Sequence, residues 1–151
     1  MNESGNTSDD VLVYAIALEA QMIRIFESCG LNERCKELSS LFIRFAEEEK
    51  THKQRLENLQ KSGQLALESA WTSSLCLKNY PVLPDPSPSM AKSEALLMAM
   101  AVEKTAYRLY SDLSAILTDP LLKSLFDLLA QEESQHKLRF ELEYDRLYAS
   151  S

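Results

Sequence analysis

The sequence predicts an all-α protein built as an antiparallel four-helix bundle, and three observations support this fold. Glycine is scarce, with 3 residues among 151, and long glycine-free stretches favour helices over a turn-rich β fold. Four segments carry apolar residues at the spacing of a helical stripe. One long connection, residues 62–90, separates two pairs of helices. The length fits a single domain over residues 1–151.

The first helix is expected from about Ser8 to Cys29. Ser8 or Asp9 can cap its start, and Gly30 suits its C-terminal stop. The second helix is expected from Asn32 to about Lys61. The apolar stripes of these two helices consist of Leu12, Ala15, Ile16, Met22, Ile23, Phe26, Leu38, Leu41, Phe42, Phe45, Leu56 and Leu59.

The connection over residues 62–90 is rich in proline and serine, and its length suits a crossover between distant helix ends. A short helical piece is expected around Gln64 to Ala70, with Trp71 pinning the segment to the core. The third helix should run from about Ser89 to Leu117. Asp119 then reads as an N-cap before Pro120 at the first position of the fourth helix, which continues to about Leu147. The inward faces of these two helices are expected to carry Leu96, Ala99, Met100, Ala106, Tyr107, Tyr110, Leu113, Leu122, Leu125, Phe126, Leu129, Phe140 and Leu147.

The two halves of the chain resemble each other at an offset of 84 residues. The segment LFIRFAEEEKTHKQRLE, from Leu41 to Glu57, aligns with LFDLLAQEESQHKLRFE, from Leu125 to Glu141, with 9 of 17 positions identical. The first and third helices align at the same offset. One helical hairpin therefore occurs twice, and two such hairpins packed face to face would form a pseudo-two-fold bundle.

Six residues form a repeated pattern of potential metal ligands. The chain has only 2 histidines, and each follows a glutamate by three residues, which places both on one helix face. Another glutamate lies 30 residues before each of these pairs, within an otherwise apolar helix face. The six residues are Glu19, Glu49, His52, Glu103, Glu133 and His136. One Glu from each of two helices and a Glu-x-x-His from each of the other two is the ligand set of a dimetal carboxylate site.

The residue types suit two iron ions, with manganese as the alternative. Four carboxylates would balance two divalent cations, whereas an unpaired buried carboxylate costs several kcal/mol or takes up a proton. The competing interpretation is that each Glu-x-x-His is a solvated helix surface. Glutamate makes up about a tenth of the chain, so two such pairs by chance have a probability on the order of 0.01. The matched glutamates on the apolar faces lower it further, so the dimetal site is favoured.

Three more residues are candidates for contacts around these ligands. Glu48 and Glu132 directly precede the ligand glutamates and could accept the second ring N–H of a histidine on the partner helix, or simply be solvated. Tyr110 lies two turns after Glu103 and could donate a hydrogen bond, but core packing is favoured because its equivalent in the first half is Phe26. Cys29, Cys35 and Cys76 lie outside the ligand pattern and are expected to be structural or incidental.

Composition excludes several other classes. The net charge of −7 argues against a nucleic-acid surface. No apolar run is long enough to span a bilayer, and the acidic, polar start is not that of a signal peptide. The number of cysteines is odd, and none forms a Cys-x-x-Cys, so no disulfide framework is indicated. These features favour a location in the reducing cytoplasm.

The sequence resembles the rubrerythrin branch of the ferritin-like superfamily. The resemblance is carried by four segments: VLVYAIALEAQMIRIF from Val11, LFIRFAEEEKTHKQRLENL from Leu41, ALLMAMAVEKTAYRLY from Ala95 and LFDLLAQEESQHKLRF from Leu125. It implies a ferritin-like bundle with a di-iron centre held by the six residues above. It also implies a role in reducing hydrogen peroxide, as in oxidative stress, or in oxidising ferrous ion. Members usually carry a rubredoxin domain, for which this chain lacks the cysteines, and often an extra glutamate where Ala106 stands.

The resulting hypothesis is an oxidoreductase in which a di-iron site reduces hydrogen peroxide or oxygen. Glu49 and Glu133 would bridge the metals, and an external donor such as a rubredoxin-type protein would return electrons. The alternatives, in order, are a ferroxidase or iron-storage protein, a dimanganese catalase-like enzyme and a non-catalytic helical interaction module. A homodimer is expected, because short bundles commonly bury a residual apolar face against a second copy.

Overall fold

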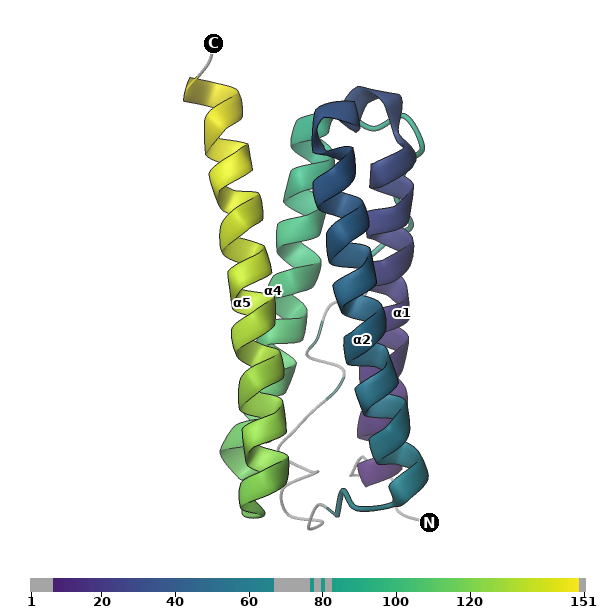
Figure 1. The fold of residues 1–151 in the computed structure, drawn as a ribbon, viewed down its shortest axis with the longest axis vertical. Helices are drawn as coiled ribbons and strands as arrows, with labels where there is room; N and C mark the ends of the chain where they lie inside the picture. Colours follow the sequence, from purple (N-terminus) through teal and green to yellow (C-terminus); the bar gives the residue numbers. More distant parts are fainter. Residues whose placement is uncertain (1–6, 67–76, 78–79, 81–82, 150–151) are drawn as a thin grey trace.

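The computed structural model describes residues 7–66, 77, 80 and 83–149, and four long helices packed side by side dominate it (Figure 1). No strand occurs within these described ranges. The elements in chain order are α1 (Ser8–Leu31), the 3-10 helix η1 (Glu33–Leu38), α2 (Ser39–Ser62), α4 (Lys92–Ile116) and α5 (Pro120–Ala149). The predicted all-α four-helix bundle is confirmed.

The bundle is made of two antiparallel hairpins, α1 with α2 and α4 with α5, that meet chiefly through α1 and α4 (Figure 1). The chain runs up α1, down α2, down α4 and up α5, so the connection between α2 and α4 must return along the length of the bundle. The described part of this connection is anchored to α1 and η1. Gln21 Nε2 donates to Leu83 O at 2.7 Å, and Arg34 Nη1 donates to Ser89 O at 2.9 Å.

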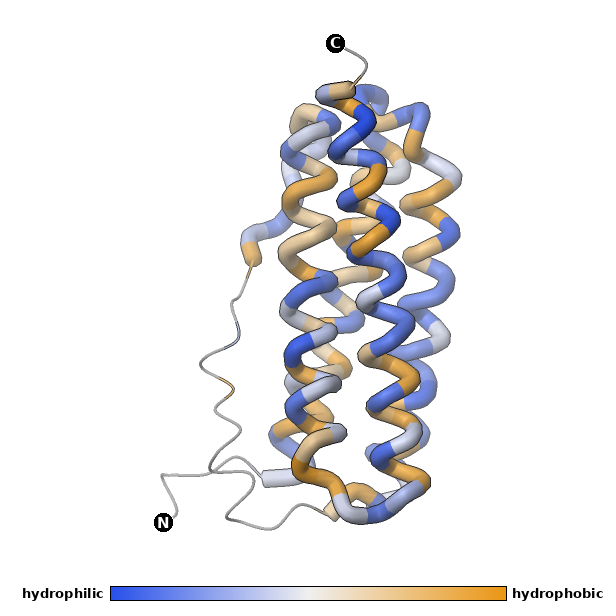
Figure 2. The backbone as a smooth tube through the Cα atoms, turned by 90° about the vertical axis from the view of Figure 1, so that its left-hand side faces the viewer, coloured by the Kyte–Doolittle hydropathy of each residue, from blue (hydrophilic) through white to orange (hydrophobic). Residues whose placement is uncertain are grey.

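Each helix turns its apolar stripe inward, and apolar and polar stretches alternate along every helix (Figure 2). Near the end where α1 passes into η1, three fully buried phenylalanines from different helices meet. The ring centroid of Phe140 lies 5.4 Å from those of both Phe26 and Phe42. Tyr107, expected in the core, is 40% exposed, because the α4 positions around it turn Ala106 and Tyr110 inward instead. None of the helices in the described ranges is long and apolar enough to cross a membrane.

Two of the expected helix boundaries are wrong in the first hairpin. Gly30 does not stop α1, which continues to Leu31; it is buried, and a Cβ there would lie 2.8 Å from Ile43 Cγ1 on α2. Its missing side chain therefore permits close packing of α1 on α2. α2 begins at Ser39 rather than Asn32, because the Asn32 side chain accepts from Arg34 N at 2.9 Å and starts a 3-10 turn. Cys35 then departs from helical geometry (φ −114°, ψ 18°).

In the second half, α4 begins at Lys92 rather than Ser89, because a turn closed by Met90 N and Ser87 O precedes it. The start of α5 agrees with the prediction: Pro120 is its first residue, and Asp119 Oδ1 accepts from Leu121 N at 2.9 Å. Residues 64–66 are not helical. The rest of the short helix expected around Gln64 to Ala70, and Trp71, lie outside the described residues.

Thr7, and not Ser8 or Asp9, caps α1. Its Oγ1 accepts from Asp10 N at 3.0 Å, and Asp10 Oδ2 accepts from Thr7 N at 2.9 Å, which is a capping box. Thr7→Ala is therefore expected to lower the free energy of unfolding by about 1 kcal/mol. Chemical denaturation would measure the loss. Thr7→Ser, which keeps the hydroxyl, is the matched control and should lose much less.

Candidate metal centre

The six predicted ligand residues converge at mid-height in the bundle interior. Each side chain comes from the inward stripe of its helix, and none of the six residues is more than 5% exposed. Glu19 lies on α1, Glu49 and His52 on α2, Glu103 on α4, and Glu133 and His136 on α5. The spacing of three residues within α2 and within α5 places each Glu and His on one face, as the sequence predicts.

The six residues form two overlapping groups, each with four potential ligand atoms within 4.8 Å of one another. The His52 group contains Glu19, Glu49, His52 and Glu133, and the His136 group contains Glu49, Glu103, Glu133 and His136. Glu49 and Glu133 belong to both groups. The arrangement therefore provides two neighbouring positions that share two carboxylates.

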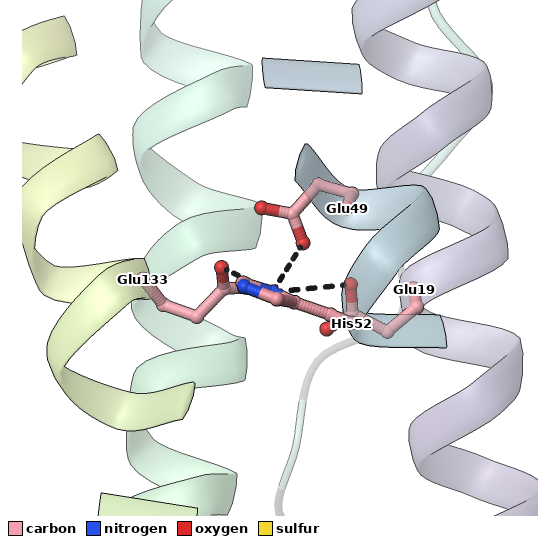
Figure 3. A group of neighbouring side chains, drawn as sticks. All are labelled: Glu19, Glu49, His52 and Glu133. Atoms are coloured by element: carbon pink, nitrogen blue, oxygen red, sulfur yellow. Dashed lines mark ion pairs between the residues drawn. The ribbon is translucent and has the colours of Figure 1, made fainter. Parts of the chain in front are cut away.

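In the His52 group, three carboxylates surround one ring nitrogen (Figure 3). His52 Nδ1 lies 3.1 Å from Glu133 Oε1, 3.3 Å from Glu49 Oε2 and 3.8 Å from Glu19 Oε1. In the His136 group, Nδ1 of His136 lies 2.9 Å from Glu49 Oε1, 3.3 Å from Glu103 Oε1 and 3.6 Å from Glu133 Oε1. The two oxygens of Glu49 thus face different histidines.

Both histidines turn Nδ1 toward the carboxylates and Nε2 toward a glutamate that precedes a ligand on the facing helix. His52 Nε2 is hydrogen-bonded to Glu132 Oε2, and His136 Nε2 lies 3.4 Å from Glu48 Oε2. With its proton on Nε2, each ring leaves a free lone pair on Nδ1, which is the tautomer a metal ligand needs. Glu48 and Glu132 therefore lie where the sequence hypothesis places them, against the histidine of the partner helix.

Tyr110 combines the two interpretations that the sequence leaves open. Its side chain is fully buried, and its ring lies 6.0 Å from that of Phe126. Its hydroxyl donates to Glu19 Oε2 at 2.5 Å. Core packing, the favoured interpretation, is therefore incomplete, because the hydroxyl also contacts a ligand carboxylate.

Two neighbours of the cluster were not singled out from the sequence. The Phe45 ring stacks on His136 with centroids 4.0 Å apart, and Arg55 Nη1 lies 3.9 Å from Glu132 Oε1. Their spacing places both on the ligand face of α2, since Arg55 follows His52 by one turn and Phe45 precedes Glu49 by one turn, but it does not show their partners on α5. Cys29 and Cys35 are buried free thiols, and burial raises the pKa of Cys29 to about 12. Cys76 lies outside the described residues.

Burial and mutual repulsion shift the carboxylates toward their protonated forms. Burial, followed by the charges of Glu103 and Glu19, raises the pKa of Glu133 to about 8. Burial also raises the pKa values of Glu19, Glu49 and Glu103 above their usual range. Burial opposes the charged form of His52, but the nearby carboxylates of Glu133 and Glu49 prevail and raise its pKa to about 12.

The polar atoms of the cluster satisfy one another only in part: His136 Nδ1 is hydrogen-bonded to Glu49 Oε1 and Glu103 Oε1, but others are not paired. Within the described residues seven buried side-chain atoms have no hydrogen-bond partner, and six of them lie in the two groups: Glu19 Oε1, Glu49 Oε2, His52 Nδ1, Glu103 Oε2, Glu133 Oε1 and Glu133 Oε2. The seventh is Arg55 Nη1. Unpaired buried polar atoms are rare in folded proteins and are costly. The six atoms in the two groups are all carboxylate oxygen or imidazole nitrogen, the donor atoms that iron and manganese accept. The donor set therefore fits a pair of such cations.

The fold and the buried Glu/His cluster together are those of a ferritin-like four-helix bundle with a candidate metal site. A sequence model of the family described as Rubrerythrin matches residues 10–144. Because this match covers most of the chain, the protein belongs to the rubrerythrin family.

Solved structures with the same fold share little sequence with this chain. A hypothetical protein from Pyrococcus furiosus is 21% identical, with a TM-score of 0.75 over 96% of this chain and 92% of that one. A two-domain protein from Anabaena variabilis, with DJ-1/ThiJ/PfpI-like and ferritin-like domains, is 19% identical, with a TM-score of 0.68. That match covers 94% of this chain and 41% of the Anabaena chain. A comparison with curated proteins found no match.

Proposed function

We propose that the protein is a non-haem di-iron oxidoreductase that reduces hydrogen peroxide or oxygen. The observation that carries the proposal is the convergence of four buried glutamates and two histidines with six unpartnered polar atoms. Glu49 and Glu133, which belong to both groups, would be available to both metals, and Glu19 and Glu103 would each hold one. His52 and His136 complete the two groups. Two bound ferrous ions would supply the two electrons that convert one hydrogen peroxide and two protons into two waters.

The chain's own residues would control protons and water around this site. The apolar stripes of the four helices exclude bulk water, since each ligand residue is almost fully buried. Glu48 and Glu132 are partly exposed beside the histidine rings, so they connect the buried site with solvent. They would fix the proton of each ring on Nε2. An external electron donor, such as a rubredoxin-type protein, would restore the reduced state.

The proposal is tested by loading the metal-free protein with ferrous ion under anaerobic conditions. Elemental analysis should find about two irons per chain, as the two overlapping groups imply. The loaded protein is then mixed separately with peroxide and with oxygen, and the rate of iron oxidation is followed by absorbance. Absence of iron uptake would overturn the proposal and leave a non-catalytic helical module.

A ferroxidase is the second candidate, and Ala106 is the observation that favours it. This buried residue lies one turn after Glu103, at the position where rubrerythrins often have an extra glutamate. Alanine supplies no ligand there, so the six ligands are matched between the two halves, and the site lacks this feature of a rubrerythrin peroxidase. A ferroxidase would react faster with oxygen or peroxide in the presence of excess ferrous ion and would build up ferric product beyond two irons per chain. Uptake of manganese from the cell instead of iron would favour a dimanganese catalase-like enzyme.

Metal uptake is expected to release protons and to strengthen with rising pH. At pH 7 the pKa values of about 8 for Glu133 and about 12 for His52 keep both groups protonated in the metal-free protein. A metal ion requires the carboxylate and the neutral imidazole, so each group must give up its proton on binding. Calorimetric titration with Mn²⁺ in buffers of different ionisation enthalpy measures this release. A proton count near zero at pH 7 would contradict the expectation.

A further inference from the structure

The two metal positions have matching ligands but different surroundings. We infer that they are unequal, and that the His52 group binds its ion more tightly than the His136 group. This inference rests on the proposed function, since it assumes that both groups bind metal. It assigns Tyr110 and Glu132 as positioning residues for the tighter position.

The first difference concerns the glutamate that belongs to one group alone. Glu19, in the His52 group, accepts a hydrogen bond from the Tyr110 hydroxyl at 2.5 Å. At the offset of 84 residues the counterpart of Tyr110 is Phe26, whose ring packs against other phenylalanines and has no hydroxyl to donate. Glu103 Oε2 is buried and has no hydrogen-bond partner in the part of the chain that the structure describes. Among the described residues, a donor from outside the ligand set therefore holds Glu19 but not Glu103.

The second difference concerns the histidine rings. His52 Nε2 forms a hydrogen bond with Glu132, whose side chain is 33% exposed and lies 3.9 Å from Arg55 Nη1 through its other oxygen. His136 Nε2 lies 3.4 Å from Glu48 Oε2 without a hydrogen bond between them; Glu48 has a nearby arginine as well, with Arg44 Nε at 4.0 Å, and its side chain is 50% exposed. Stacking on Phe45 fixes the plane of the His136 ring, but an aromatic face does not accept the ring proton as a carboxylate does. The proton of His52 is thus held more firmly on Nε2.

Both differences favour the same position. Groups that contact a metal ligand from outside orient it and set its protonation, and their removal typically lowers metal affinity about 10- to 100-fold. The two positions also share Glu49 and Glu133, so the second ion meets carboxylates already engaged by the first. The His52 group should therefore load first, and the His136 group should load last and release its ion first.

The test is a stepwise anaerobic titration of the metal-free protein with Mn²⁺, followed by calorimetry and by electron paramagnetic resonance. Two binding steps are expected, with affinities that differ by about 10-fold or more. Crystals grown with one Mn²⁺ per chain should show the anomalous signal beside His52. Equal signals at both positions, or two indistinguishable steps, would overturn the inference while leaving the proposed function intact. If Mn²⁺ does not bind, the same titration is made with ferrous ion, and absence of binding of both ions would overturn the inference and the proposed function together.

Paired variants test the two positioning residues. Tyr110→Phe removes one hydroxyl and gives both halves phenylalanine at this position, so the tighter step should weaken about 10-fold and approach the weaker one. Glu132→Gln should also weaken the tighter step, whereas the matched variant Glu48→Gln should change the weaker step much less. Thermal unfolding without metal checks that each variant is folded. If Tyr110→Phe and Glu132→Gln leave both steps unchanged, these residues do not position the ligands.

Discussion

Glu49→Ala is expected to abolish the binding of two metal ions. Glu49 belongs to both groups, and its two oxygens face different histidines, with Oε1 2.9 Å from His136 Nδ1 and Oε2 3.3 Å from His52 Nδ1. Removing the carboxylate therefore takes one ligand atom from each position at once. Elemental analysis after anaerobic loading should fall from about two irons per chain in the parent protein to well below one.

His136→Ala provides a graded comparison, because His136 belongs to one group only. The His52 group remains complete, so this variant should keep about one metal ion per chain and lose the second. Glu47→Gln is the matched control: Glu47 is a neighbouring α2 glutamate whose exposed side chain pairs with Lys50. It should bind two ions. If Glu49→Ala still binds two irons with unchanged affinity, the ligand assignment is wrong.

The ligand positions could be predicted from the sequence because they depend on helix periodicity alone. Glu49 and His52 share a helix face at any plausible helix boundary, and the 84-residue offset repeats the relation in Glu133 and His136. The prediction of the fold also depends on helix periodicity and not on exact helix ends, so it was correct although some predicted helix ends were wrong. The exact start of α2, seven residues after its expected place, depends on how the Asn32 side chain competes with the helix for backbone hydrogen bonds.

Contacts between helices were harder to predict, because they depend on the rotation of one helix against another. The spacing from Glu103 places Tyr110 on the inward face of α4, but it does not show that its hydroxyl reaches Glu19 on α1. The approach of Arg55 on α2 to Glu132 on α5 likewise requires the packed structure. The close contact of Gly30 with Ile43 is a further case, since a glycine near a helix end usually indicates a stop.

Glu103→Gln is expected to stabilise the metal-free protein and to remove much of the stabilisation that metal provides. Burial, with the charges of Glu49 and Glu19, raises the pKa of Glu103 well above its usual range, so folding without metal forces this group to bind a proton. The amide of glutamine has a similar shape and needs no proton. At pH 7 we expect a gain of about 1 to 3 kcal/mol in the free energy of unfolding, measured by chemical denaturation.

The difference in the free energy of unfolding between the parent and Glu103→Gln should depend on pH, which a change in packing alone would not produce. Below about pH 4.5 Glu103 is protonated in both the folded and the unfolded chain, so the parent and the variant should differ little. As the pH rises, only the unfolded chain releases the proton, and the parent loses stability relative to Glu103→Gln by up to about 1.4 kcal/mol per pH unit. Asn32→Ala, at a buried polar residue with satisfied partners, is the control and should destabilise the protein.

Adding metal should make the parent protein more stable than Glu103→Gln, which reverses the order of stability expected without metal. A ligand present at about 1,000 times its dissociation constant stabilises the folded state by about 4 kcal/mol, and the parent should gain this while Glu103→Gln gains much less. A buried glutamate held by contacts of its own would instead destabilise the protein on replacement, with or without metal. Opposite signs in the two states are therefore expected only if Glu103 is kept in the core to bind a cation. A loss of stability in metal-free Glu103→Gln at pH 7 would contradict that role.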